Sequence, residues 1–310
     1  MSLFKACDWW STTCGADEEF DKGCLAVANI DNNSDNLDKI ITGSHSGVLR
    51  IYKPLPIKQE DGTYSSFRPD DLLLETQLKN PIIHLGVGVL SSTSTLLQLA
   101  VLQPFKLSVF SVSVNGHTVE SYRFQSLASA SDDNTENENI GFKGKRVAPE
   151  WTYILADSAM DIIMVDDKTS PTVAILGEKF VTGLNSHGSI KFSKKLSFMP
   201  RCFTCYREEH HGFLIILVVT ANQTLLIYHE TQLKWAVQLM FPPICITRAS
   251  FTDIRGILTL LSEEGSLACC YLGTQPSLFV SPLSEPQEID FKVAEQEMER
   301  LKKVIKSSNQ

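Results

Sequence analysis

The sequence contains no long hydrophobic run. Its most apolar stretch extends from Phe213 to Thr220 and is bounded by His210–His211 and by Asn222. These eight residues are far fewer than the ~20 that a membrane-spanning helix needs, but they suit a buried strand. The opening segment MSLFKACDWW has too short an apolar run for a signal peptide, and Asp8 interrupts it. We therefore expect a soluble, cytoplasmic protein.

Clustered positive charge is also missing. The chain has a formal net charge of −8, and its nearest approach to a basic patch is Lys143, Lys145 and Arg146. A protein that binds nucleic acid needs a stripe of Lys and Arg to neutralise the phosphate backbone. The sequence therefore predicts no nucleic-acid partner.

The sequence lacks the motifs of catalytic and cofactor-binding sites. A nucleophile elbow needs a serine between two glycines, but in the segment Gly43–Gly47 the central residue is His45. The pair Gly86 and Gly88 is not followed by the third glycine of a dinucleotide-binding loop, and no P-loop motif occurs. We therefore predict no catalytic residue and no cofactor, and expect that the protein is not an enzyme.

One cluster has the spacing of metal ligands. Cys202, Cys205 and His210 match the first three ligands of a zinc knuckle, but position 215, where the fourth would stand, is Ile215. Structural zinc needs four ligands in a closed tetrahedron, so we predict no metal site. The eight cysteines are expected to be reduced thiols, several of them packed as small apolar residues.

What the sequence does contain is a repeated pattern of short strand, tight polar turn and short strand. Three turns have a glycine directly before the second strand, and glycine supplies the positive φ that a tight hairpin requires. The pattern occurs five times: Asp38–Tyr52, Thr95–Val112, Thr172–Phe192, Phe213–His229 and Gly256–Leu272. The three glycines are Gly47, Gly188 and Gly265.

The spacing of these hairpins indicates a β-propeller. The turns at Gly188, Gln223 and Gly265 are 35 and 42 residues apart, close to the ~40–45 residues of a four-stranded blade. Five complete hairpins and part of another blade around Val119–Leu127 predict an all-β propeller of about five to six blades. A β-sandwich is the alternative fold.

Alternation along the strands predicts which side chains are buried between the sheets. The eight expected positions are Leu49, Ile51, Val109, Ile190, Phe192, Leu225, Ile227 and Leu267. Trp9 and Trp10 precede the first hairpin and are expected to seal the ring, and Trp235 is expected in the core between blades.

Two stretches fall outside the strand pattern. Residues 126–145 form an acidic, polar tract and are expected to be a flexible loop within a propeller domain of residues 1–283. Residues 284–310 are expected to be a helical linker, the start of a coiled coil, because apolar residues recur at heptad spacing. This seam consists of Ala294, Met298, Leu301 and Ile305. We expect it to bind a partner, and the alternative is that it folds back on the last blade of the propeller, near Leu278 and Phe279.

Several short sequence segments, in order along the chain, resemble those of a known family. They are MSLFKACDWWST, LRIYKPLP, DLLLETQL, LKWAVQL, CYLGTQPSLF and MERLKKVIK. Together they resemble the parathyroid-hormone-responsive B1 family, which is the family of the ninth Bardet–Biedl syndrome protein. The resemblance extends from Met1 to Gln310 with one gap between Val109–Ser113 and Val119–Gln125, where the family has roughly two more blades.

The resemblance implies a seven-bladed propeller in a scaffold subunit of the BBSome, the coat that traffics membrane proteins to and from the primary cilium. It implies other BBSome subunits as partners and, indirectly, an Arf-like GTPase and ciliary membrane cargo. It also implies peripheral membrane association through the complex and a location in the cytoplasm, the cilium, the ciliary membrane and the basal body. A propeller-fold hydrolase and a small-ligand-binding β protein are the alternatives. Whether the shortened ring closes is left open.

Overall fold

The chain was analysed in a computed structural model. It describes residues 4–59, 64–90, 95–115, 121–126, 150–165, 171–208, 212–252, 254–274, 298 and 300–302. The chain divides into two compact units, Met1–Gly273 and Thr274–Gln310. Most of the acidic tract predicted at 126–145 and most of the predicted terminal helix lie outside the described residues. Met298 and residues 300–302 are described, and they are helical. Within the described residues, no helix is long and apolar enough to cross a bilayer.

The first unit is built from twenty strands and two short 3-10 helices, η1 (Lys22–Cys24) and η2 (Pro69–Asp71). The strands of its first half are β1 (Phe4–Thr13), β2 (Leu25–Ala28), β3 (Lys39–Gly43), β4 (Val48–Tyr52), β5 (Leu72–Gln77), β6 (His84–Gly88), β7 (Gln98–Gln103), β8 (Lys106–Asn115) and β9 (Ser121–Ser126). The remaining strands are β10 (Ala159–Val165), β11 (Thr172–Gly177), β12 (Phe180–Leu184), β13 (Ile190–Lys195), β14 (Pro200–Arg207), β15 (Leu214–Thr220), β16 (Thr224–His229), β17 (Gln232–Gln238), β18 (Pro243–Ser250), β19 (Arg255–Ser262) and β20 (Ser266–Thr274).

These strands form five four-stranded antiparallel sheets, so the predicted all-β propeller is confirmed. We name them blade 1 (β2–β5), blade 2 (β6–β9), blade 3 (β10–β13), blade 4 (β14–β17) and blade 5 (β18–β20 with β1). The segment expected to begin another blade, around Val119–Leu127, instead supplies β9, the fourth strand of blade 2.

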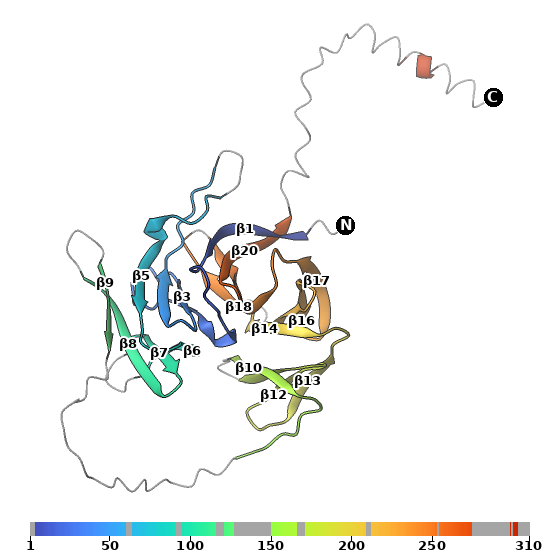
Figure 1. Ribbon diagram of the computed structural model, residues 1–310. Coiled ribbons are helices and arrows are strands. Elements are labelled where there is room, and N and C mark those ends of the chain that lie inside the picture. Colours follow the sequence, from blue (N-terminus) through green and yellow to red (C-terminus); the bar gives the residue numbers. More distant parts are fainter. Residues whose placement is uncertain are drawn as a thin grey trace, which may run out of the picture. The chain divides into compact units, whose positions relative to one another are not determined.

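The N-terminal strand completes the last blade. β1 pairs with β20, so blade 5 takes strands from both ends of the unit (Figure 1). Trp9 and Trp10 on β1 are both buried in a cluster with residues of blades 5 and 1. Both tryptophans therefore join the first part of the chain to the last, as the sequence predicted.

Turn geometry explains the regular hairpins. Gly47, Gly188 and Gly265 have φ values of +86°, +75° and +82°, a region that residues with a Cβ rarely enter. At Gly47 a Cβ would also lie 2.6 Å from the carbonyl oxygen of Leu78. Glycine at these turns therefore sets the register of the strands that follow.

The predicted core is largely correct. Leu49, Ile51, Leu225, Ile227 and Leu267 are buried, and Val109 and Phe192 are half-buried. Ile190, in contrast, is 53% exposed, so its prediction is wrong. It pairs across blade 3 with Leu184, on the opposite face from Ala174, Leu176 and Val181, which pack toward blade 4.

Four apolar clusters fill four interfaces between neighbouring blades, namely those between blades 5 and 1, 1 and 2, 3 and 4, and 4 and 5. The inner strands β10, β14, β18, β2 and β6 pack against one another in that order. β6 and β10 are the two ends of this series. Among the described residues, they do not pack against each other in the same way. The ring is therefore open between blades 2 and 3.

The open interface leaves apolar side chains in water. Ile162 and Met164 on the inner strand β10 are 61% and 75% exposed, and Leu107 on β8 is also exposed. On the other inner strands most apolar side chains are covered by the next blade. Ile162 and Met164 lie on the face of blade 3 that also presents Val173 and Ile175.

We expect this face to tolerate polar substitution. Changing Ile162 and Met164 together to Thr keeps a side chain that favours strands and should change the free energy of unfolding by no more than about 1 kcal/mol, because exposed substitutions have small effects. Leu176→Ala on the buried face of the same blade is the matched control and should cost about 2–5 kcal/mol. Urea unfolding measures both. A loss above about 2 kcal/mol for the double variant would show that this face is covered.

Candidate functional site

The predicted partner-binding seam is only partly described. Met298 and Leu301 lie in helical backbone, and the side chain of each is more than half exposed. Ala294 and Ile305 lie outside the described residues. Two exposed apolar side chains three positions apart are compatible with a docking seam, and the partner-binding role of these four residues stays a prediction.

The cysteines of the metal-like cluster point to different interfaces. Cys202 belongs to the cluster between blades 4 and 5, whereas Cys205 belongs to the cluster between blades 3 and 4. His210 and His211 lie outside the described residues. Two ligands on opposite faces of β14 cannot share one tetrahedral ion. In the part of the chain that the structure describes, no three His, Cys, Asp or Glu residues are grouped as a metal site.

All eight cysteines are free thiols. Burial raises the pKa of Cys24 to about 11 and that of Cys205 to about 12. At neutral pH such thiols are protonated and are poor nucleophiles or ligands. They act as small apolar side chains in the clusters between blades.

The alternative of a propeller-fold hydrolase requires acidic or histidine side chains that gather near the inner strands. Burial raises the pKa of Asp161 on β10, and the nearby charges of Lys22 and His84 partly offset this effect. The Asp161 carboxylate accepts a hydrogen bond from the backbone N–H of Ile162. Among the hydrogen bonds of the described residues, none joins Asp161 to His84, so they do not form the linked acid and base that catalysis requires.

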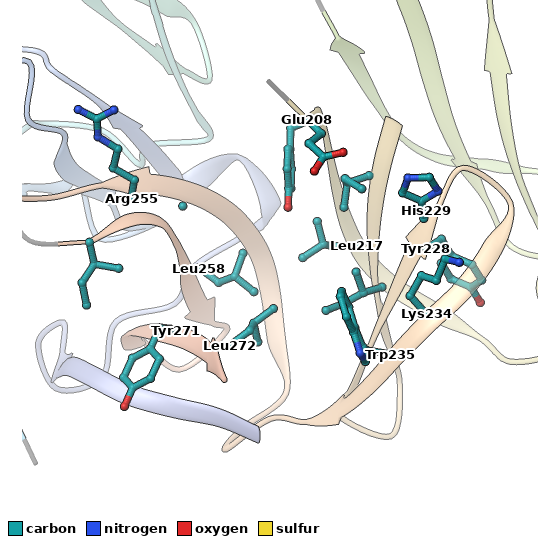
Figure 2. Close-up of a pocket in the computed structure, with 15 residues that line it drawn as sticks. Glu208, Leu217, Tyr228, His229, Lys234, Trp235, Arg255, Leu258, Tyr271 and Leu272 are labelled. Atoms are coloured by element: carbon teal, nitrogen blue, oxygen red, sulfur yellow. The ribbon is translucent and has the colours of Figure 1, made fainter. Parts of the chain in front are cut away.

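A hollow with a volume of about 720 Å³ lies between blades 4 and 5. Figure 2 shows Leu217, Lys234 and Trp235 on one side of it and Leu258, Tyr271 and Leu272 on the other. We call it the interblade pocket. Its aliphatic residues are Ile215, Leu217 and Ile227 from blade 4 and Ile254, Leu258 and Leu272 near or within blade 5.

The pocket forms where the core between the two blades ends. Leu217, Ile227 and Leu258 are buried in that core, whereas Ile215 and Leu272 at its margin are only partly buried. The two sheets contact each other both at the inner strands β14 and β18 and at the outer strands β17 and β1, and the pocket lies at the margin of the core between them. An apolar floor with an open outer side follows from this geometry.

The side chain of Arg248 on blade 5 contacts an aromatic ring of blade 4 beside the pocket. The guanidinium carbon of Arg248 on β18 lies 4.4 Å from the centroid of the Tyr206 ring on β14, a cation–π contact. Gly256 makes room for it, because a Cβ at this position would lie 3.0 Å from Arg248 Nε. Gly256 also has a φ of +76°. The positive φ and the short distance to Arg248 both favour glycine at position 256.

The charged groups at the pocket are mainly positive. Lys234 and Arg255 line it, together with one carboxylate, Glu208, and with His229. Burial raises the pKa of the Tyr206 phenol; the positive charge of Arg248 opposes this shift and Glu208 adds to it. The tyrosine therefore stays neutral at physiological pH and offers a hydroxyl and an aromatic face.

Sequence reasoning missed this pocket because it placed Trp235 in the core. The side chain is 52% exposed, since β17 is the outer strand of blade 4 and Trp235 projects toward the pocket. The segment QLKWAVQ contained a signal for this: glutamine at both ends and a lysine beside the tryptophan mark a strand at the solvent edge.

Comparison with known proteins gives a consistent family match. A family model described as PTHB1 N-terminal matches residues 1–120 and 112–276. Protein PTHB1 of Xenopus laevis is 35% identical over 399 aligned residues, which cover 99% of this chain and 46% of that protein. Protein PTHB1 of Homo sapiens is 33% identical, with 100% of this chain and 45% of that protein covered. The chain spans about half the length of the curated relatives it matches.

The alignment with the Xenopus laevis protein is longer than this chain. Since the alignment with the Xenopus laevis protein spans 399 positions and the chain has 310 residues, at least 89 positions have no counterpart in this chain. The two matches to the family model meet at residues 112–120, where β8 ends and β9 begins. The gap inferred from the sequence falls at the same point.

A solved structure supports the fold. The chain is similar to the protein in a structure described as "Crystal structure of BBS1N in complex with ARL6DN, soaked with mercury", with a TM-score of 0.54. The match covers 88% of this chain and 98% of that chain at 11% sequence identity. At this identity, the likeness concerns the propeller fold.

Proposed function

We propose, because the chain belongs to the PTHB1 family, that it is a non-enzymatic scaffold subunit of the BBSome, the coat that moves membrane proteins into and out of the primary cilium. The observation that carries this proposal is 33–35% identity to the Xenopus laevis and human proteins over 99–100% of the chain. A propeller suits the role, because its blades offer a rigid, many-sided surface for other proteins.

The proposed partners are other BBSome subunits. The structural neighbour is described as a complex with ARL6DN, and this supports the proposal that the present chain reaches an Arf-like GTPase indirectly, through the assembled coat. Ciliary membrane cargo and peripheral membrane association would follow from the same assembly. The proposed locations are the cytoplasm, the primary cilium with its membrane, and the basal body.

We assign separate roles to the two regions predicted from the sequence. Residues 1–283 are the propeller, with residues 126–145 as a flexible loop, and residues 284–310 are a helical linker. The apolar seam of Ala294, Met298, Leu301 and Ile305 is the proposed partner-binding element. The exposed side chains of Met298 and Leu301 support this role, because burying a large apolar side chain on association contributes about 1.5–3 kcal/mol before ordering costs.

The test is co-purification from ciliated cells. The tagged chain should recover other coat subunits, and changing Met298, Leu301 and Ile305 together to Asp should reduce their recovery at least tenfold without altering the melting temperature. A control with Gln296, Ser307 and Asn309 changed to Asp adds the same three charges away from the seam and should behave like the wild type. If the unchanged chain recovers no coat subunit, the proposed function is wrong. If the seam variant recovers them fully, the helix is a passive linker.

A further inference from the structure

We propose that the interblade pocket is a docking site for an extended, acidic peptide segment of a partner protein, with bulky apolar side chains placed between its carboxylates. This inference rests on the proposed function of the chain as a protein-binding scaffold. It concerns a surface on the propeller that is separate in sequence from the seam at residues 294–305.

The floor and walls of the pocket fit large apolar side chains. Leu217, Leu258 and Leu272 supply aliphatic surface, and the rings of Tyr206, Trp235 and Tyr271 stand around it. Tyrosine and tryptophan are the residue types that most often dominate binding energy at protein interfaces. Trp235 is half exposed without a ligand, so a bound apolar side chain would remove a large aromatic surface from water.

The charges at the pocket favour an acidic occupant. Among the described residues, Lys234 and Arg255 line the pocket with one carboxylate, Glu208, and Arg248 lies beside Tyr206 and Gly256 of the lining, although the whole chain has a net charge of −8. The arginines Arg50, Arg68 and Arg201 each have a carboxylate partner. Arg248 and Arg255 have no ion pair among the residues that the structure describes. A carboxylate next to an apolar side chain would pair with these cations, and the local positive charge would orient it.

The neighbouring strand favours an extended peptide over a compact small molecule. β17 is the outer strand of blade 4, paired only with β16, and its Lys234 and Trp235 line the pocket. β1 lies beside part of β17, and elsewhere along the outer edge of β17 the N–H and C=O groups can pair with a peptide backbone while alternate side chains enter the pocket. A volume of about 720 Å³ accommodates several such side chains.

The pocket is also formed in advance of binding. Arg248 is held against the Tyr206 ring, and Gly256 leaves the space for it. A side chain already fixed by its neighbours loses little freedom when a ligand binds, so less binding energy is lost to ordering. Gly256→Ala should displace Arg248 and weaken binding without touching the ligand directly.

The test uses a fluorescein-labelled nine-residue peptide in which Glu alternates with Leu and Phe, and a second peptide with Lys in place of Glu. Fluorescence polarisation with the whole chain should show saturable binding of the acidic peptide and at least tenfold weaker binding of the basic one. Lys234→Glu with Arg255→Glu, and separately Trp235→Ala, should each weaken acidic-peptide binding at least tenfold. Lys106→Glu with Lys195→Glu, at exposed lysines of blades 2 and 3, is the charge-matched control and should bind within twofold of the wild type.

Three results would overturn the proposal: failure of the acidic peptide to bind, equal binding of both peptides, or wild-type binding by the Lys234/Arg255 and Trp235 variants. Circular dichroism melts show whether a variant that binds weakly is still folded. The coat pull-down distinguishes this failure from failure of the proposed function. If coat subunits are recovered while the acidic peptide does not bind, the pocket has another role and the scaffold function stands.

Discussion

Replacing Trp10 with Ala is expected to destabilise the propeller more than any other single truncation on β1. Its side chain is 1% exposed, and its Nε1 donates a hydrogen bond of 2.8 Å to Asp71 Oδ2. The ring also packs edge-on against Tyr52 and Phe67, at centroid distances of 5.7 and 6.1 Å. Because β1 belongs to blade 5 and Tyr52 to blade 1, this one side chain joins these two blades.

The expected cost of Trp10→Ala is about 3–5 kcal/mol for the lost burial and the cavity. The buried Asp71 carboxylate would also lose one of its two donors, which adds about 1 kcal/mol, while it keeps the hydrogen bond from the Arg68 N–H and the ion pair with the Arg68 guanidinium. Urea unfolding followed by tryptophan emission and by circular dichroism measures the loss. Since a small domain is stable by only about 5–15 kcal/mol, the variant should be largely unfolded at 37 °C.

Trp10→Phe separates the two contributions. It keeps most of the aromatic packing but removes the hydrogen bond to Asp71, so it should cost less than Trp10→Ala. Ser11→Ala is a neighbouring control on the same strand. Ser11 Oγ donates a hydrogen bond to Asp8 Oδ2 at the surface, so this variant should change the free energy of unfolding little. A cost below about 1 kcal/mol for Trp10→Ala would show that β1 does not hold the unit together.

The local elements of this fold could be predicted from the sequence because their causes are local. Glycines with positive φ at residues 47, 188 and 265 determine the turns. The alternation of apolar and polar residues along each strand determines which side chains share a face. Leu49 and Leu225 are buried as expected. Five hairpins at blade-like spacing were enough to indicate a propeller.

The errors arose where burial depends on a neighbouring sheet. Ile190 has the right alternation, but its face of blade 3 has no blade packed on it. Trp235 lies on the outer strand of blade 4, and its side chain is at the margin of the interface with blade 5. The interblade pocket is lined by residues that are far apart in the sequence, such as Tyr206 and Tyr271, so no short motif marks it.

The open interface has a consistent explanation in the alignments. The 89 or more residues that the Xenopus laevis protein has in excess equal about two blades at ~40–45 residues each. The two matches to the family model meet at residues 112–120, and blades inserted at that point would follow blade 2 and precede blade 3. The exposed side chains of Ile162 and Met164 lie on the side of blade 3 that such a blade would cover.

The second large effect is expected at a buried ion pair in blade 1. Lys39 Nζ lies 2.6 Å from Asp31 Oδ1, and both side chains are almost completely inaccessible to solvent. The ammonium also donates to Asn29 Oδ1 at 3.0 Å and to the Leu37 carbonyl oxygen at 2.8 Å. It therefore ties the loop between β2 and β3 to the first residue of β3.

Removing the Lys39 ammonium should cost about 3–5 kcal/mol, because the Asp31 carboxylate is left buried without its counter-ion. Removing the Asp31 carboxylate should cost less, because Asp35 Oδ1 lies 3.8 Å from Lys39 Nζ. Lys39→Met and Asp31→Leu are the single variants, and the double variant should recover most of the loss, since two apolar side chains of similar size need no partner. A double-mutant cycle by urea unfolding measures the coupling between the two positions. The exposed pair of Arg201 and Glu263, 3.3 Å apart, is the control, and Arg201→Ala should cost less than about 1 kcal/mol. If the effects at positions 31 and 39 are additive, the two charges do not stabilise one another and the loop is held by the hydrogen bonds to Asn29 and Leu37.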